Sequence, residues 1–169
     1  RDRSVSRGLG DVYKRQLLSH YKMLAWVGYQ GAVQYPGVVI PTQSDADKYP
    51  QYASFHKTTY NADRIMGEMS NAASDGRNAG LAVHCGEFGC SKNVAEAMRL
   101  AWFTDMVAAM EANNIPWTLW ECLDGGFGFV DMEYGIYRIN CPLLKVLTGK
   151  ELTDAEAKAL LQKYGFKTE

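Results

Sequence analysis

The sequence contains no long apolar run and no large excess of charge. No uninterrupted apolar stretch approaches the roughly 20 residues that a membrane-spanning helix needs, and the 169 residues carry a net charge of -1. A nearly neutral chain gives no electrostatic reason to expect binding to nucleic acid or to an anionic membrane surface. With 47% apolar and 22% charged residues, the composition is that of an ordinary globular domain. We therefore expect neither nucleic acid nor a membrane among its partners.

Motifs for the commonest cofactor and nucleophile chemistries are missing too. The chain contains no Gly-x-Gly-x-x-Gly, no P-loop, no Gly-x-Ser-x-Gly and no His-Glu-x-x-His. Its four cysteines form neither a Cys-x-x-Cys pair nor a zinc-binding Cys/His spacing: they are Cys85, Cys90, Cys122 and Cys141. We therefore expect no metal and no cofactor, and the α/β enzymes that these motifs mark are disfavoured.

The first 16 residues differ in character from the rest of the chain. They are dense in charge, follow neither the helical nor the strand period, and meet the apolar pair Leu17-Leu18 abruptly. They are similar to the adapter-derived tails that recur on reading frames translated from metagenome assemblies. We expect residues 1–16 to be non-native and residues 17–169 to be part of one domain, truncated at its N-terminus. The lack of a signal peptide then carries no information.

The stretch from Leu81 to Gly89 has the clearest functional pattern. It opens with three apolar residues, a run too short for a helix, and then reaches Glu87 between Gly86 and Gly89. A short apolar run of this kind is typical of a buried strand in a parallel sheet. The pattern therefore predicts a strand that carries a carboxylate to the edge of a sheet.

A second stretch of the same kind follows further along the chain. Ile115–Trp120 predicts a strand that ends at Glu121 and runs into the glycine-rich segment 124–128. Between the two strands, apolar residues keep a helical spacing from Val94 to Met110. The order strand, helix, strand predicts a parallel pair, and in a β/α barrel the carboxyl ends of such strands hold the active site.

The remaining segments carry weaker signals, mostly proline, glycine and helix-capping residues. No repeat or low-complexity linker divides the chain, and a loop as long as the second segment below is usually functional. In chain order we expect a strand end at Leu17–Tyr21, a long loop over Lys22–Tyr52, a helix that begins near Asn61 and stops at Ser74–Gly76, a helix capped by Ser91 or Asn93, a hairpin within Met132–Cys141, one or two helical turns at Leu143–Leu147, and a final helix from Thr153.

Three groups of residues follow one another in an order found in one known family. They are Gly86-Glu87-Phe88-Gly89 at a strand end, Arg99 and Trp102 on the next helix, and Trp117-Thr118-Leu119-Trp120 leading to Gly126-Phe127-Gly128. Together they resemble glycoside hydrolase family 5, the cellulase family of the clan A barrels. His20-Tyr21 and Tyr29-Gln30-Gly31-Ala32 are similar to the family's His-x-Tyr strand end and downstream His-Gln-Gly-Ala. Here the first two residues are adjacent, and Tyr29 stands where the family often has histidine.

The resemblance implies an α/β fold, namely the C-terminal part of a TIM (β/α)8 barrel with roughly strands 6 to 8 and their helices. Complete barrels typically need about 250 residues, and 153 remain here after residue 16. Residues 17–169 would then be a partial glycoside hydrolase catalytic domain. By the same resemblance we expect the full-length protein to be a monomer that is secreted or periplasmic.

The resemblance also implies roles for individual residues. In the family, the glutamate of Gly-Glu-Phe-Gly closes the seventh strand and is the catalytic nucleophile, which here is Glu87. A tryptophan that closes the eighth strand forms the sugar platform beside the cleaved bond, which here is Trp120. Further candidate substrate contacts are His20, Tyr21, Glu121 and Trp26.

A retaining glycosidase also needs a second carboxyl group, about 5–5.5 Å from the nucleophile. The family supplies it from an Asn-Glu pair that closes the fourth strand, and the chain has no such pair. The only candidates within the fragment are Glu121, Asp124 and Asp131, at or beyond the second strand, where the family keeps substrate contacts. We therefore expect the acid/base residue in a missing N-terminal half, and we expect this fragment alone to be inactive.

Plain structural roles stay open for several of these residues. Glu87 could be a solvated loop charge, and Trp120 could pack in the core. Trp26 could stack on a sugar or anchor a lid, and Glu121 could bind a sugar hydroxyl or stay in solvent. Packing roles are favoured for Trp102, Trp117 and His84, and a loop role for His56.

The sequence as a whole favours a retaining β-glycosidase that hydrolyses β-linked glucans, of the endoglucanase type. The expected partner is therefore a polysaccharide or oligosaccharide substrate. Two alternatives remain: a mannanase or other β-glycanase of the same family, and a non-catalytic carbohydrate-binding protein on a degenerate barrel.

Overall fold

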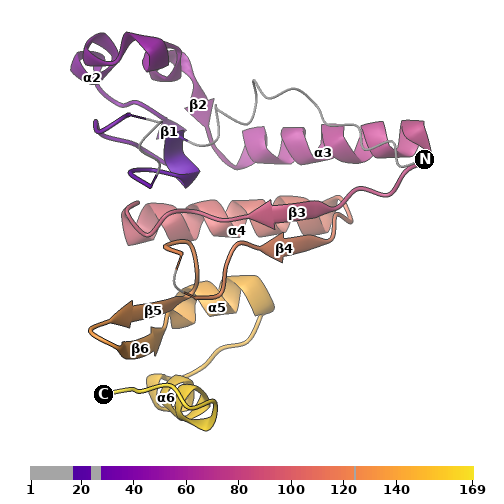
Figure 1. Cartoon of the computed structure of the whole chain (residues 1–169). Helices are drawn as coiled ribbons and strands as arrows, with labels where there is room; N and C mark the ends of the chain where they lie inside the picture. Colours follow the sequence, from indigo (N-terminus) through magenta and orange to yellow (C-terminus); the bar gives the residue numbers. More distant parts are fainter. Residues whose placement is uncertain (1–16, 24–27, 124) are drawn as a thin grey trace.

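The computed structural model describes residues 17–23, 28–123 and 125–169. Two long helices, α3 and α4, lie side by side at its centre, with short strands and smaller helices on either side (Figure 1). The elements are β1 (Gly37–Val38), α2 (Gln43–Lys48), the 3-10 helix η1 (Pro50–Lys57), β2 (Thr59–Tyr60), α3 (Ala62–Ala79), β3 (Cys85–Phe88), α4 (Glu96–Ala112), β4 (Trp117–Leu119), β5 (Val130–Glu133), β6 (Ile136–Ile139), α5 (Cys141–Thr148) and α6 (Asp154–Lys163). No helix among the described residues is long and apolar enough to cross a membrane.

The unit β3–α4–β4 is the strand, helix and strand that the sequence predicts. β3 and β4 pair in parallel, and α4 packs its apolar side against them. Phe88 of β3 contacts the rings of Trp102 and Phe103 on α4 and of Trp117 on β4. The packing roles predicted for Trp102 and Trp117 are thus confirmed.

The start of α4 differs from the prediction. The helix begins at Glu96 after Ala95, which gives no side-chain cap, so neither Ser91 nor Asn93 caps it. Both side chains instead bond to the carbonyl oxygen of Tyr21. Tertiary contacts here outcompete the local capping chemistry of serine and asparagine.

The β3 strand contains a bulge at the position of the predicted carboxylate. Cys85 pairs with Trp117 and Phe88 with Leu119, so β3 uses one residue more than β4 over the same length. An extra residue of this kind re-aims the side chains around it. Cys85 and Phe88 both pack against the core, whereas Glu87 between them is exposed.

Two expectations about this strand are wrong. It begins at Cys85 rather than at Leu81, which is 49% exposed. His84 is exposed rather than packed, with its Nε2 3.4 Å from Thr118 Oγ1. The sequence predicts a strand buried on both faces, which needs residues packed on the side opposite α4. The described residues leave Leu81 and His84 exposed there.

Helix α3 begins where predicted and ends later. The Asn61 side chain accepts a hydrogen bond from Arg64 N–H at the N-terminus, and the helix continues through Gly76 to Ala79 before Gly80 closes it with φ +66°. Gly76 does not stop the helix, because it serves packing. A Cβ there would overlap Val83 Cγ2, so the glycine lets the chain entering β3 lie directly against α3.

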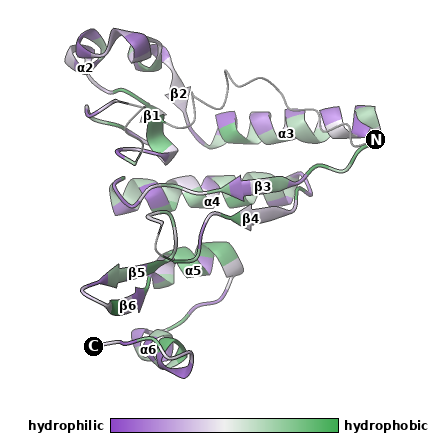
Figure 2. Cartoon of the chain, viewed as in Figure 1, coloured by the Kyte–Doolittle hydropathy of each residue, from purple (hydrophilic) through white to green (hydrophobic). Residues whose placement is uncertain are grey.

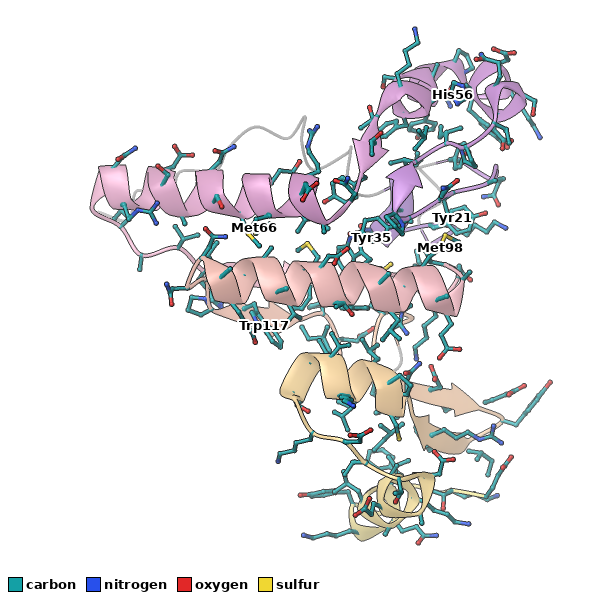
Figure 3. All side chains as sticks on the ribbon, turned by 180° about the vertical axis from the view of Figure 1, so that it is seen from behind. Tyr21, Tyr35, His56, Met66, Met98 and Trp117 are labelled. Carbon is teal, nitrogen blue, oxygen red and sulfur yellow. The ribbon has the colours of Figure 1, made fainter. Side chains whose placement is uncertain are left out.

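Residues 28–60 form a small folded unit, here called the aromatic lobe, although the sequence predicts a long loop over Lys22–Tyr52. It contains β1, α2, η1 and β2, and buried Tyr29 packs edge-on against the rings of Tyr49 and Tyr52. Tyr35 ties the lobe to α4, since its N–H lies 3.4 Å from Met98 Sδ and its hydroxyl donates to Asp105 (Figure 3). The elements are too short for a periodic signal, so aromatic packing rather than local pattern holds them.

The remaining predictions are mostly confirmed. The hairpin is β5 and β6, paired antiparallel, and the last helix opens with a complete capping box between Thr153 and Glu156. The helix α5 starts at Cys141 after an Asn140 cap. Figure 2 shows apolar residues concentrated on α5 and on the inner sides of α3 and α4. Leu17–Tyr21 is not a strand end: residues 17–19 are helical and a turn follows.

The packing of Gly76 leads to a test within a single helix. Gly76→Ala should lower the free energy of unfolding by about 1–3 kcal/mol, because the added methyl group overlaps Val83. Gly67→Ala in the same helix should raise it by up to about 1 kcal/mol, since an exposed helical glycine with open space above it gains helix propensity as alanine. Urea unfolding followed by circular dichroism measures both.

The matched control adds Val83→Ala to Gly76→Ala, which should recover part of the loss. A gain in stability for Gly76→Ala equal to that for Gly67→Ala would show that the packing argument is wrong.

Candidate active site

The carboxyl ends of β3 and β4 lie next to each other, as parallel pairing requires. Trp120 N–H donates to Phe88 O at 2.8 Å, directly beyond the paired residues. Glu87 and Trp120 therefore sit at the ends of neighbouring strands, and both are exposed. The peptide bond between Trp120 and Glu121 is cis.

Gly89 makes this close approach of the two strand ends possible. A Cβ on Gly89 would overlap the carbonyl oxygen of Trp120 and press on the Phe127 ring. Any other residue would push the end of β4 away from β3. The second glycine of Gly-Glu-Phe-Gly thus has a steric reason that involves Trp120 directly.

A buried arginine joins the segments that follow the two strands. Arg99 of α4 is 5% exposed, and its Nε donates to Cys90 O at 2.8 Å. Its Nη2 donates to the carbonyl oxygens of Phe127 and Gly128, both at 2.6 Å. Burial lowers the pKa of the guanidinium, yet an arginine keeps its charge at any physiological pH. We call this set of bonds the Arg99 clasp.

Further bonds from the residues after β3 strengthen the same junction. Lys92 N–H donates to Gly126 O at 2.8 Å, and Lys92 Nζ donates to Val130 O at 2.7 Å. Ser91 N–H donates to Ser19 O at 2.7 Å. One short connection between β3 and α4 thus holds the segment around residue 19, the glycine-rich loop and the hairpin.

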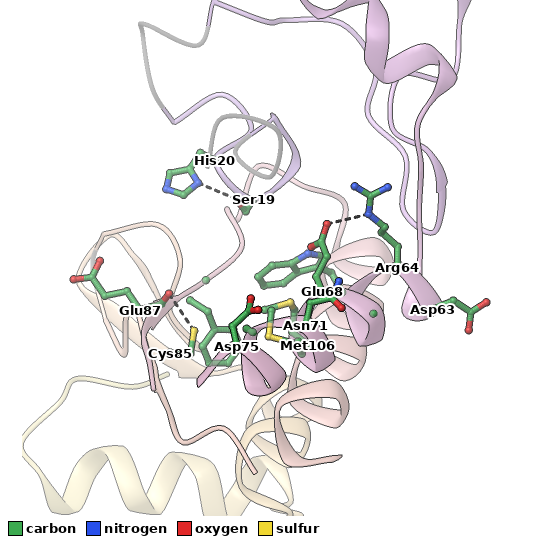
Figure 4. Close-up of a pocket in the computed structure, with 16 residues that line it drawn as sticks. Ser19, His20, Asp63, Arg64, Glu68, Asn71, Asp75, Cys85, Glu87 and Met106 are labelled. Carbon is green, nitrogen blue, oxygen red and sulfur yellow. Dashed lines mark hydrogen bonds and ion pairs between the residues drawn. The ribbon is translucent and has the colours of Figure 1, made fainter. Parts of the chain in front are cut away.

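The Glu87 carboxyl group is free to meet a ligand. Within the described ranges, it has no hydrogen-bond or ion-pair partner. Figure 4 shows its carboxyl group pointing away from the polar side chains of α3, such as Glu68 and Asp75. An exposed carboxylate on a strand end, fixed by a bulge, is available for chemistry.

His20 lines the same cavity as Glu87, and Tyr21 follows it in the chain. The open cavity, of about 760 Å³, lies between α3 and β3. The His20 ring hydrogen-bonds through Nδ1 to Ser19 Oγ at 2.9 Å and meets Phe127 edge-on. Burial lowers the pKa of His20, so the ring is neutral near pH 7. Tyr21 donates its hydroxyl to Gly31 O at 2.8 Å and packs against the core.

Trp120 and Glu121 present two different surfaces. Trp120 is 51% exposed, which leaves a face of the indole open. Glu121 is half-buried, and among the described residues its Oε1 is buried without a hydrogen-bond partner. Gly125 packs directly on that carboxyl group, where a side chain would overlap it. A buried carboxylate oxygen without a partner is costly.

The remaining candidate residues have different surroundings. Asp131 forms an ion pair with Lys92 at 2.9 Å. Trp26 and Asp124 lie outside the described residues. His56 lies in the 3-10 helix η1 rather than in a loop, and its Nδ1 bonds to Ile40 O at 2.8 Å inside the aromatic lobe. Across residues 17–23, 28–123 and 125–169, no three metal-ligating side chains gather at one point.

Sequence reasoning missed the residues that position the site. Ser91, Lys92 and Asn93 resemble a helix start, and Arg99 stands among the apolar residues of α4 that are buried. A single charge on the apolar side of a helix is the signal that could have found the Arg99 clasp.

Comparison with known proteins gives one family match. Residues 34–126 match the model of the cellulase family, glycosyl hydrolase family 5. No curated protein sequence matches the chain.

Solved structures resemble the chain in fold. A glycoside hydrolase is 21% identical with a TM-score of 0.57, and the match covers 83% of this chain and 39% of that one. The mutant form of Cel5A from Thermotoga maritima, in complex with cellobiose, is 19% identical with a TM-score of 0.55, covering 80% of this chain and 36% of that one. The chain spans only 27% of the first of the solved structures that it matches.

The Arg99 clasp predicts a large loss of stability on substitution. Arg99→Met should lower the free energy of unfolding by about 2–4 kcal/mol, because three buried carbonyl groups lose a charged donor. Arg99→Lys should lose nearly as much, since an ammonium group cannot span the same positions. Urea unfolding followed by tryptophan fluorescence measures the change.

Arg138→Met is the control, because Arg138 forms an exposed pair with Glu169. Its effect should stay below about 1 kcal/mol. Equal effects at the two arginines would contradict the clasp.

Proposed function

The chain belongs to the cellulase family, glycosyl hydrolase family 5, and on that premise we propose that it is the C-terminal part of a retaining β-glycosidase. The family is built on the TIM barrel. We assign β3 and β4 to the seventh and eighth barrel strands and α4 to the helix between them. The observation that carries the proposal is the exposed Glu87, which stands beside Trp120 at the ends of adjacent parallel strands.

The open side of β3 supports this assignment. Among the described residues β3 pairs with β4 alone, and the cavity under α3 borders β3. In a barrel every strand has two neighbours. We propose that the strand preceding β3 in the complete protein pairs with this open edge of β3. Residues 17–19, which are helical here, do not supply it.

The proposed mechanism assigns the nucleophile to Glu87. Its carboxylate attacks the anomeric carbon of the sugar while a second carboxylic acid, from the preceding part of the protein, protonates the departing oxygen. The resulting glycosyl-enzyme is then hydrolysed by water, with the second group now acting as base. The absence of any ion-pair partner on Glu87 among the described residues suits a group that must reach the substrate.

The remaining candidates would bind the sugar. The exposed indole of Trp120 would stack on the ring next to the cleaved bond, and the half-buried carboxyl group of Glu121 would accept a hydrogen bond from a sugar hydroxyl. His20 would contact substrate from the shared cavity. Tyr21, whose hydroxyl is already bonded to Gly31, would hold the segment that carries His20. Trp26, in the predicted loop Lys22–Tyr52, stays a candidate for stacking on a sugar.

The proposed substrate class is a β-linked glucan. The name of the family and the cellobiose carried by the Thermotoga maritima relative support a glucan. Mannan remains the alternative. We further propose that the complete protein is a secreted or periplasmic monomer, and that residues 1–16 are foreign to it.

The experiment uses the full-length protein encoded by the source gene. Glu87→Gln should lower the kcat on soluble β-glucan by roughly three orders of magnitude or more, because the amide cannot attack the anomeric carbon. Glu87→Ala with added azide should regain turnover and release a glycosyl azide of inverted configuration. Reducing-sugar assays and product NMR measure the two effects.

Glu111→Gln, on the exposed end of α4, is the matched control and should leave kcat unchanged. Substantial turnover by Glu87→Gln would show that Glu87 is not the nucleophile. A full-length protein that binds glucan, hydrolyses none and lacks the second carboxyl group would instead be a carbohydrate-binding protein.

A further inference from the structure

The hairpin of β5 and β6 extends beyond the ends of the two barrel-like strands. Figure 1 shows its tip pointing in the direction in which β3 and β4 run. The hairpin starts beside the site, because Val130 N–H donates to Cys122 O at 3.1 Å. At about 3.4 Å per residue, its tip lies about 14 Å further along the strand.

The residue at the tip is a tyrosine without structural support. Tyr134 is 95% exposed, whereas the other exposed large apolar side chains range from 37% to 68%. Its φ is +50° and that of Gly135 is +76°. A two-residue turn with two positive φ values favours asparagine followed by glycine, and a bulky residue there is an outlier. Neither packing nor backbone preference accounts for tyrosine.

The hairpin beneath this tyrosine is held firmly. Lys92 anchors β5 through Val130 O and Asp131. On the other strand, Tyr137 N–H donates to Lys167 O at 2.8 Å, and the Tyr137 ring packs against Phe166. The tip is therefore a bare aromatic ring on an anchored support. Such an arrangement costs little conformational entropy when a ligand binds.

The surroundings of the ring favour a neutral ligand with an apolar face. Met132, near the end of β5 and close to the tip in the chain, is 48% exposed. Asp131 is already paired with Lys92, and the nearest charge along the chain is the carboxylate of Glu133, which would repel an anionic polymer. A pyranose ring in a β-glucan has C–H groups on its faces and hydroxyls around its rim, so it stacks on tyrosine without bringing charge.

We propose that Tyr134 is an outlying sugar platform, which binds a distant ring of the same glycan chain that Trp120 holds near the cleaved bond. This inference rests on the proposed function and adds a preference for long chains. The hairpin is about 14 Å long from its start beside Cys122 to its tip. This length places Tyr134 beyond the ring at Trp120. Short substrates therefore cannot reach it.

The test compares substrates of different length in the full-length enzyme. Tyr134→Asn should raise KM for cellohexaose and soluble β-glucan roughly five- to twentyfold, with kcat and the KM for an aryl cellobioside unchanged. The same variant should unfold at a higher temperature, since Asn-Gly suits the turn better. Tyr134→Phe should keep the wild-type KM, and Tyr164→Ala, an exposed tyrosine at the end of α6, is the control.

The outcomes separate this inference from the function on which it rests. If the wild-type enzyme cleaves both substrates and Tyr134→Asn changes neither KM, or both equally, the platform is wrong. A change of oligomeric state on substitution would assign the tip to a second copy of the chain and would also overturn it. If the wild-type enzyme cleaves neither substrate, the proposed function itself fails.

Discussion

The guanidinium group of Arg99 is the interaction on which the geometry of the site depends. It lies inside the protein and donates hydrogen bonds to three main-chain carbonyl groups, one after β3 and two after β4. The paired part of the two strands is short, so their hydrogen bonds alone would fix the strand ends weakly. Through Arg99, helix α4 sets the positions of both connections. The distance between Glu87 and Trp120 is therefore controlled from behind the sheet.

The two faces of the β3–β4 pair have opposite characters. One face packs Phe88 and Trp117 onto α4, while the other leaves Glu87, Thr118 and Trp120 exposed. The bulge in β3 brings about this division at Glu87, because it keeps Cys85 and Phe88 in the core and turns the intervening residues outward. Structure and chemistry are thus divided across a single pair of strands. Substitutions on the packed face should act on stability and those on the open face on substrate.

Local patterns in the sequence were enough to predict the parts that local physics controls. The parallel pair, the helix between it, the hairpin and the starts of α3 and α6 follow from apolar spacing and from the caps at Asn61 and Thr153. The family motif located Glu87 and Trp120, and the structure places them on adjacent strand ends. Features that depend on distant contacts were missed. Ser91 and Asn93 bond to Tyr21 instead of capping α4, Gly76 serves packing instead of ending α3, and the aromatic lobe forms from elements too short to carry a period.

Among the described residues one side of β3 has no partner strand, and this has a consequence for the isolated chain. An open strand edge presents main-chain donors and acceptors in a row, ready to accept another strand. Pairing between the open edges of two chains is bimolecular, so it increases with protein concentration and competes with correct folding. β3 itself carries a single charged residue, Glu87, between Gly86 and Phe88. The surface that admits a neighbouring strand in a complete barrel is thus also where isolated copies would begin to aggregate.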